Sequence, residues 1–142
     1  MKNSKEMLSS LLKTTQLGQT GIRSVLDQSM AAGLRCTLCN QLQEYNSIEA
    51  EAHAIASQRG WELRDLEPAV RFLTDRTTRF RLTGENSDSR IADIMIRYST
   101  SGMIQGLRNL HQFSMPDQRI RMLSQRLLDC ENAGILKLQS YL

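Results

Sequence analysis

The chain has 142 residues, of which 40% are hydrophobic, 23% are charged and 5% are aromatic. This length fits one domain spanning residues 1–142 and excludes two domains of ordinary size. Its 8 glycines and 2 prolines are too few for an all-β protein divided into short strands, so we expect one all-α domain. The 18 Lys and Arg residues exceed the 15 Asp and Glu residues by three, and this small excess gives no support for nucleic-acid binding.

The first two helices are predicted from apolar positions spaced three and four residues apart. Asn3 or Ser4 can cap the first helix, whose stripe is Leu8, Leu11, Leu12, Thr15, Gly18, Ile22, Val25 and Leu26. We expect it to end near residues 27–29, with Ser29 capping the second helix. That second helix carries Leu34, Leu38, Gln41, Leu42, Tyr45, Ile48, Ala52, Ile55 and Ala56 and ends before Arg59 and Gly60. Because the link is short, the two helices should be antiparallel.

The third helix is predicted to begin at Pro68, after a loop at residues 61–67 in which Asp65 can act as a cap. Residues 83–88 are poor helix formers, so we expect a break or kink there before the helix continues to about residue 112. A capping box at residues 114–117 should open the last helix. In the first half of the third helix, we expect the following apolar residues to face the core: Val70, Phe72, Leu73, Phe80 and Leu82.

These elements predict an up-down-up-down four-helix bundle whose third helix is broken or kinked near residues 83–88. The competing layout is a five-helix array in which residues 68–82 pack separately from residues 89–112. In either layout the core should contain Leu12, Ile22, Leu38, Tyr45, Ile48, Leu123 and Leu127.

Several segments carry a resemblance to a known family. They are residues 43–49 (QEYNSIE), followed by an Ala-rich turn and residues 59–61 (RGW), and then residues 91–96 (IADIMI) and 99–104 (STSGMI). The chain resembles a small uncharacterised bacterial family of ferritin-like four-helix proteins over nearly its whole length. The resemblance implies a ferritin-like bundle. Enzymes of that superfamily hold two iron or manganese ions with Glu from two helices and Glu-x-x-His from the other two.

The chain departs from this metal-ligand pattern. Three residues after Glu44 stands Ser47, and three residues after Glu131 stands Gly134, where the pattern has His. Glu44 and Glu131 are the metal-ligand candidates under the alternative of an iron or manganese protein. We favour instead that each carboxylate pairs with an Arg of a neighbouring helix, and we expect no catalytic residues, cofactor or bound metal.

Cysteines and arginines offer two further motifs. Cys36-x-x-Cys39 has the spacing of a metal or redox pair, but it falls inside a helix, and we interpret Cys36, Cys39 and Cys130 as reduced core residues. The arginines of residues 71–81 are interrupted by Asp75 at the spacing of intrahelical ion pairs, which favours a solvated face over a nucleic-acid surface.

A Gly102-x-x-x-Gly106 ridge permits close helix approach, inside the bundle against Gly18 and Gly21 or across a dimer interface. We therefore expect a non-catalytic interaction or structural protein that forms a homodimer through helix faces. The amphipathic N-terminal segment contains Lys13 and Gln16 and indicates neither a signal peptide nor a membrane span, so we expect a cytoplasmic protein.

Overall fold

The computed structural model of the chain describes residues 3–82, 87–112 and 117–142. Within these ranges it contains five α-helices and no strand, which confirms the all-α class. None of the described helices is long and apolar enough to cross a lipid bilayer. The helices are α1 (Ser4–Arg23), α2 (Ala32–Gln58), α3 (Pro68–Leu82), α4 (Asp88–Gln112) and α5 (Gln118–Leu138), and a short 3-10 turn, η1 (Gln139–Tyr141), follows.

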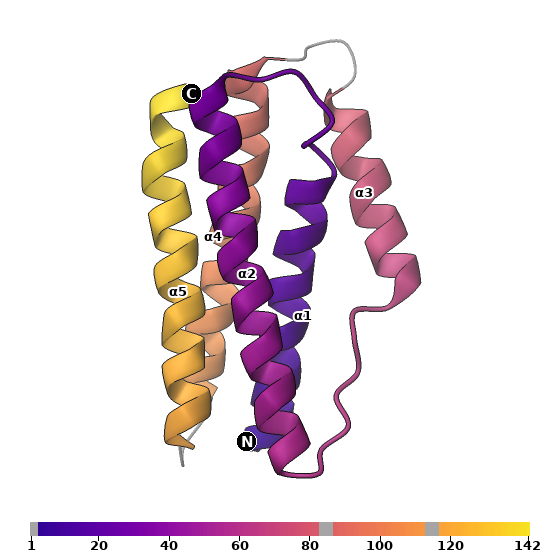
Figure 1. Cartoon of the computed structure of the whole chain (residues 1–142), viewed down its shortest axis with the longest axis vertical. Coiled ribbons are helices and arrows are strands. Elements are labelled where there is room, and N and C mark those ends of the chain that lie inside the picture. Colours follow the sequence, from indigo (N-terminus) through magenta and orange to yellow (C-terminus); the bar gives the residue numbers. More distant parts are fainter. Residues whose placement is uncertain (1–2, 83–86, 113–116) are drawn as a thin grey trace.

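The four long helices α1, α2, α4 and α5 lie side by side, and α3 lies outside them (Figure 1). Their closest pairs are α1 with α2, α2 with α5, α5 with α4, and α4 with α1, so the four helices form a closed ring around one core. α3 packs mainly against α1. The core is therefore built by four helices, and the fifth covers one side of it.

The direction of α3 corrects the predicted helix order. α3 and α4 run in opposite directions, since the C-terminal end of α3 lies beside the N-terminal end of α4 (Figure 1). Arg90 of α4 donates to the carbonyl of Arg81 at 2.9 Å, and Thr78 lies 2.5 Å from Tyr98, as expected for antiparallel helices. The order of the four long helices is up, down, down, up, and the predicted up-down-up-down order is wrong.

α3 is a separate helix, as in the five-helix layout, and not the first half of a kinked third helix. It ends at Leu82, and α4 begins at Asp88; residues 83–86 of the predicted break lie outside the described residues. The predicted core side of α3 is also wrong for most of its members. Thr78 and Leu82 are its buried residues, whereas Phe72 and Leu73 are each 62% exposed and Phe80 is 77% exposed. The apolar periodicity of α3 does not identify its buried face, because Phe72, Leu73 and Phe80 are exposed.

The helix ends follow the predicted capping residues in part. Asn3 caps α1 by accepting from the backbone of Glu6 at 2.8 Å, and Gly60 takes a φ of 67° just after α2. Ser29 does not cap α2, because the residue before that helix is Ala31. Asp117 caps α5, while residues 114–116 of the predicted capping box lie outside the described residues.

All seven predicted core residues are at most 3% exposed: Leu12, Ile22, Leu38, Tyr45, Ile48, Leu123 and Leu127. All three cysteines are free thiols; the core prediction is confirmed for Cys130, which is buried, holds only in part for Cys39, which is half-buried, and is wrong for Cys36, which is exposed. Cys36 lies outside the buried stripe of α2, which includes Leu34, Leu38 and Gln41. Periodicity thus placed the core correctly on the four long helices.

Candidate functional site

A group of polar side chains lies inside the ring of four helices, and we call it the polar centre: Glu131 of α5, Tyr45 and Gln41 of α2, and Ser99 of α4. Glu131 is only 2% exposed, and its Oε1 accepts a short hydrogen bond from the hydroxyl of Tyr45. Gln41 Nε2 donates to Tyr45 Oη and to Ser99 Oγ, each at 3.0 Å. The polar centre therefore joins three helices through side chains that are all buried.

Glycines make room for these side chains. A Cβ atom at Gly134 would lie 2.6 Å from Gln41 Nε2, and one at Gly18 would lie 2.6 Å from Tyr45 Cζ, both too close for a real contact. At Gly102 a Cβ would collide with Glu131 Oε2. The glycine ridge of α4 thus admits α5 side chains inside the bundle, Glu131 at Gly102 and Leu128 at Gly106. The predicted facing glycines, Gly18 and Gly21, instead make room for Tyr45 and Tyr98.

Burial controls the charge of the polar centre. Loss of solvent raises the pKa of Glu131 from 4.5 to about 8, although the Tyr45 hydrogen bond opposes this by lowering it. The pKa of Tyr45 is raised well above 10, mainly by burial and to a smaller extent by the Glu131 charge. Burial is also the main cause that raises the pKa of Cys130 to about 12. At neutral pH the Glu131 carboxyl is therefore mostly protonated, and the polar centre is uncharged.

The two metal-ligand candidates make separate contacts. Glu44 Oε1 pairs with Arg126 Nε of α5 at 2.5 Å, which confirms the predicted Arg pairing for this carboxylate. Arg126 also donates to Ser47 at 2.7 Å, so the residue at the expected His position supports the same ion pair. For Glu131 the predicted Arg partner is wrong, because its partner is Tyr45. Among the residues that the structure describes, no group of three His, Cys, Asp or Glu side chains could hold a metal ion.

Gln16 of α1 ties the connection between α2 and α3 to the bundle. This side chain is 1% exposed. Its Nε2 donates to Glu49 of α2 and to Asp65, each at 2.9 Å, and its Oε1 accepts from the backbone of Leu66 at 2.6 Å. Asp65 therefore binds α1. The residue directly before α3 is Glu67, whose carbonyl accepts from Arg71 at 3.1 Å, and not the predicted Asp65. One amide holds two helices and the chain that leads into α3.

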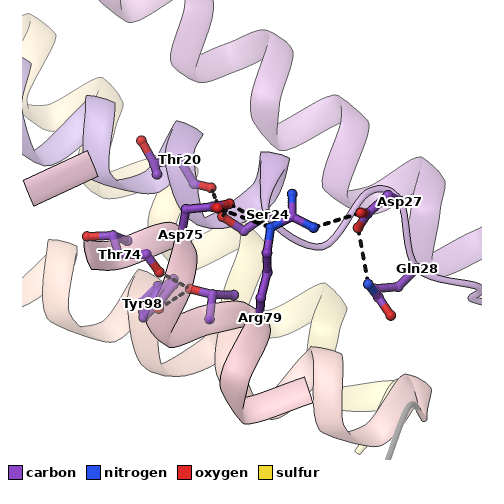
Figure 2. Close-up of polar contacts among 9 residues, drawn as sticks. Thr20, Ser24, Asp27, Gln28, Thr74, Asp75, Arg79 and Tyr98 are labelled. Atoms are coloured by element: carbon purple, nitrogen blue, oxygen red, sulfur yellow. Dashed lines mark hydrogen bonds and ion pairs between the residues drawn. The ribbon is translucent and has the colours of Figure 1, made fainter. Parts of the chain in front are cut away.

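Polar contacts also fasten α3 to the C-terminal end of α1 (Figure 2). Ser24 Oγ lies 2.7 Å from Asp75 Oδ1, and Arg79 reaches Asp75 at 3.0 Å and Asp27 at 2.7 Å. The Ser24 hydrogen bond lowers the pKa of Asp75, and the Arg79 hydrogen bond lowers that of Asp27. The predicted intrahelical spacing of Asp75 and Arg79 is confirmed, and the Arg79 side chain also bridges to the segment after α1.

A tyrosine of α4 completes the attachment of α3. The Tyr98 hydroxyl lies 2.5 Å from Thr78 Oγ1, and Thr78 also donates to the carbonyl of Thr74 at 2.7 Å (Figure 2). The Tyr98 ring occupies the space beside Gly21 of α1, where a Cβ would lie 2.5 Å from its Cδ2 atom. α3 is thus held by hydroxyl and carboxylate contacts, with Leu82 as its buried apolar residue.

Sequence reasoning identified Glu131 as a candidate but missed Tyr45, Gln41 and Ser99 as its partners. The available signal was the set of inward glycines, because Gly18, Gly102 and Gly134 leave space beside an apolar stripe that a larger polar group can fill. Comparisons with protein-family models, with curated proteins and with solved structures give no match.

We predict that Glu131→Gln makes the protein more stable near neutral pH. The native carboxyl stays protonated up to about pH 8, whereas in the unfolded chain it ionises near pH 4.5. Wild-type stability is therefore lost as pH rises between these values, by on the order of 1 kcal/mol for each pH unit. The side-chain carbonyl of glutamine can still accept the Tyr45 hydrogen bond. Because glutamine does not ionise, the variant does not lose stability as the pH rises. Urea unfolding at a series of pH values should show a stability difference that grows up to pH 8 and disappears near pH 4.5.

A difference that is the same at every pH would contradict the buried acid. Glu44→Gln is the matched control, because it changes a carboxylate on α2 that is ion-paired and 39% exposed. This control should lower stability slightly and should not show the gain above pH 4.5 that is expected for Glu131→Gln.

We predict that Asp75→Ala loosens α3 while leaving the four long helices protected. The substitution removes the carboxylate that binds both Ser24 and Arg79. Hydrogen exchange followed by mass spectrometry should show faster exchange in peptides from α3 and unchanged exchange in α2 and α5. Asp93→Ala removes an ion pair within α4 and is the control. Equal loss of protection throughout the chain would show that α3 is not a separate unit of stability.

Proposed function

We propose that the chain is a non-catalytic interaction protein of the ferritin-like type and that it acts as a homodimer. The connectivity supports the family relationship. α2 and α4 run in the same direction and are joined by one long crossover that contains α3 and returns along the bundle (Figure 1). Ferritin-like folds are four-helix bundles with one such crossover.

The contacts of the carboxylates support a non-catalytic role. Glu44 is paired with Arg126, Glu49 accepts from Gln16, and Glu131 accepts from Tyr45, so each of the three joins two helices. Iron or manganese binding by Glu44 and Glu131 is the alternative, but neither carboxylate has a contact that favours it. We therefore assign these groups to holding the bundle together.

The observation that carries the interaction function is the exposed face of α3. This outer stripe consists of Ala69, Phe72, Arg76 and Phe80, which are all exposed and lie three or four residues apart. Phe72 and Phe80 are 62% and 77% exposed, and the Arg76 guanidinium lies 5.8 Å from the centre of the Phe72 ring. Large aromatic side chains gathered on one exposed helix face are typical of a protein–protein interface.

The spacing within the outer stripe favours a second copy of the chain as the partner. Phe72 and Phe80 each lie four residues from Arg76, so these three residues of the stripe are arranged symmetrically about Arg76. Two α3 helices that pack antiparallel around a two-fold axis would place Phe72 of each copy against the partner's Phe80. The Arg76 stems would cover the rings while their charged ends remain in water.

We predict that wild-type protein is a dimer and that the double variant Phe72→Ser, Phe80→Ser is a monomer. Sedimentation velocity over a range of concentrations should show this difference, and circular dichroism should show unchanged helix content. The control variant is Met122→Ser, Leu136→Ser, which removes two side chains of α5 that are 65% and 60% exposed, and it should remain dimeric. A monomeric wild type at every concentration, or a dimeric Phe72 and Phe80 variant, would contradict the proposed interface.

A further inference from the structure

A cleft of roughly 650 Å³ lies between α1, α3 and α4. Thr74 and Thr77 contribute to it from α3, while Phe72 and Phe80 do not line it. Gly18 and Gly102 line the cleft, and so does Glu131 of α5, which reaches it beside Gly102. The cleft therefore leads from the surface to the buried carboxyl of the polar centre.

Apolar side chains from all three helices are exposed in this cleft. Leu17 of α1 is 38% exposed, Leu73 of α3 is 62% exposed and Ile104 of α4 is 48% exposed, and all three line it. These three side chains therefore form the apolar part of the cleft lining. A ligand with an aliphatic part would remove these surfaces from water.

The charged groups of the cleft are mainly cationic. Arg81 and Arg108 line it, and within the described residues neither guanidinium has an ion pair. Each comes from the C-terminal part of its helix, and α3 and α4 are antiparallel, so the two arginines lie toward opposite ends of the cleft. The one acid in the lining, Glu131, is buried, and its raised pKa of about 8 keeps it mostly neutral at pH 7. An anion at either end of the cleft thus meets one permanent cation and little opposing charge.

We propose that this cleft binds an aliphatic carboxylate, whose chain covers Leu17, Leu73 and Ile104 and whose head group pairs with Arg81 or Arg108. A planar guanidinium matches the two oxygens of a carboxylate in a bidentate hydrogen bond. Thr74 and Thr77 also line the α3 wall of the cleft. None of the four residues of the outer stripe lines the cleft, so the two proposals rest on different side chains of α3.

Isothermal titration calorimetry of the full chain with sodium octanoate at pH 7 tests the proposal. We expect saturable binding that is weakened about tenfold or more in the double variant Arg81→Gln, Arg108→Gln. Arg97→Gln is the matched control, since Arg97 is 69% exposed on α4 and does not line the cleft, and it should bind as wild type does. Thr77→Trp places a large side chain in the cleft and should abolish binding without altering the buried core.

1-Octanol has the same chain length without the charge and should bind more weakly than octanoate. The proposal is overturned if wild type shows no saturable binding of octanoate at millimolar concentration, if octanol binds equally well, or if the Arg81 and Arg108 variant keeps the wild-type affinity.

The pH dependence of octanoate binding distinguishes the cleft from a surface cation. Among the groups around Glu131, Tyr45 of α2 has a pKa raised well above 10 and the neighbouring Cys130 of α5 one raised to about 12. Gly102 of α4 and Thr14 of α1 are uncharged, and Arg81 and Arg108 in the cleft are permanently charged. Glu131 is thus the group that ionises as pH rises through 8, and its negative charge should repel the carboxylate. Wild-type affinity should fall between pH 7 and 9, and Glu131→Gln should remove this fall. The same pH dependence in both proteins would overturn the assignment of octanoate to the cleft.

Discussion

A carboxyl group buried inside a helical bundle has to be neutralised or bonded, and in this protein the Glu131 carboxyl meets that requirement without a counter-cation. The Tyr45 hydroxyl binds one oxygen, and burial raises the pKa of the acid to about 8. Gln41 then binds both Tyr45 and Ser99, so that satisfying one acid engages α2, α4 and α5 together. The space for these groups exists because Gly18, Gly102 and Gly134 carry no side chain.

The position of α3 follows from a different balance of forces. Its inward face offers only Thr78 and Leu82 for burial, so the helix cannot be held by hydrophobic contact alone. Asp75 and Arg79 fasten it to the end of α1 instead, and Tyr98 binds Thr78 from α4 (Figure 2). A helix attached along one edge in this way leaves a cleft beside it and exposed aromatic side chains on its outer surface. Both candidate binding surfaces of the protein therefore result from the weak apolar attachment of a single helix.

Much of the fold can be predicted from the sequence, because periodicity marks the buried face of a helix that is covered on one side. The seven core residues chosen in this way are all buried. The same reasoning fails for α3, where Phe72 and Phe80 have the spacing of a core stripe but face outward, since periodicity does not tell which element covers a face. The partner of Glu131 could not be predicted either: Tyr45 is 86 positions away and reads as an ordinary aromatic core residue.

The central claim is that Glu131 is a neutral, buried acid at physiological pH. The most direct test is a carbon-13 NMR titration of the side-chain carboxyls in protein labelled at glutamate, with Glu131→Gln used to assign the signal. The structure predicts a carboxyl signal with a midpoint near pH 8 that is absent from the variant. A Glu131 midpoint at or below 4.5 would show that the carboxylate is ionised and solvated, and would contradict the account of both the polar centre and the cleft.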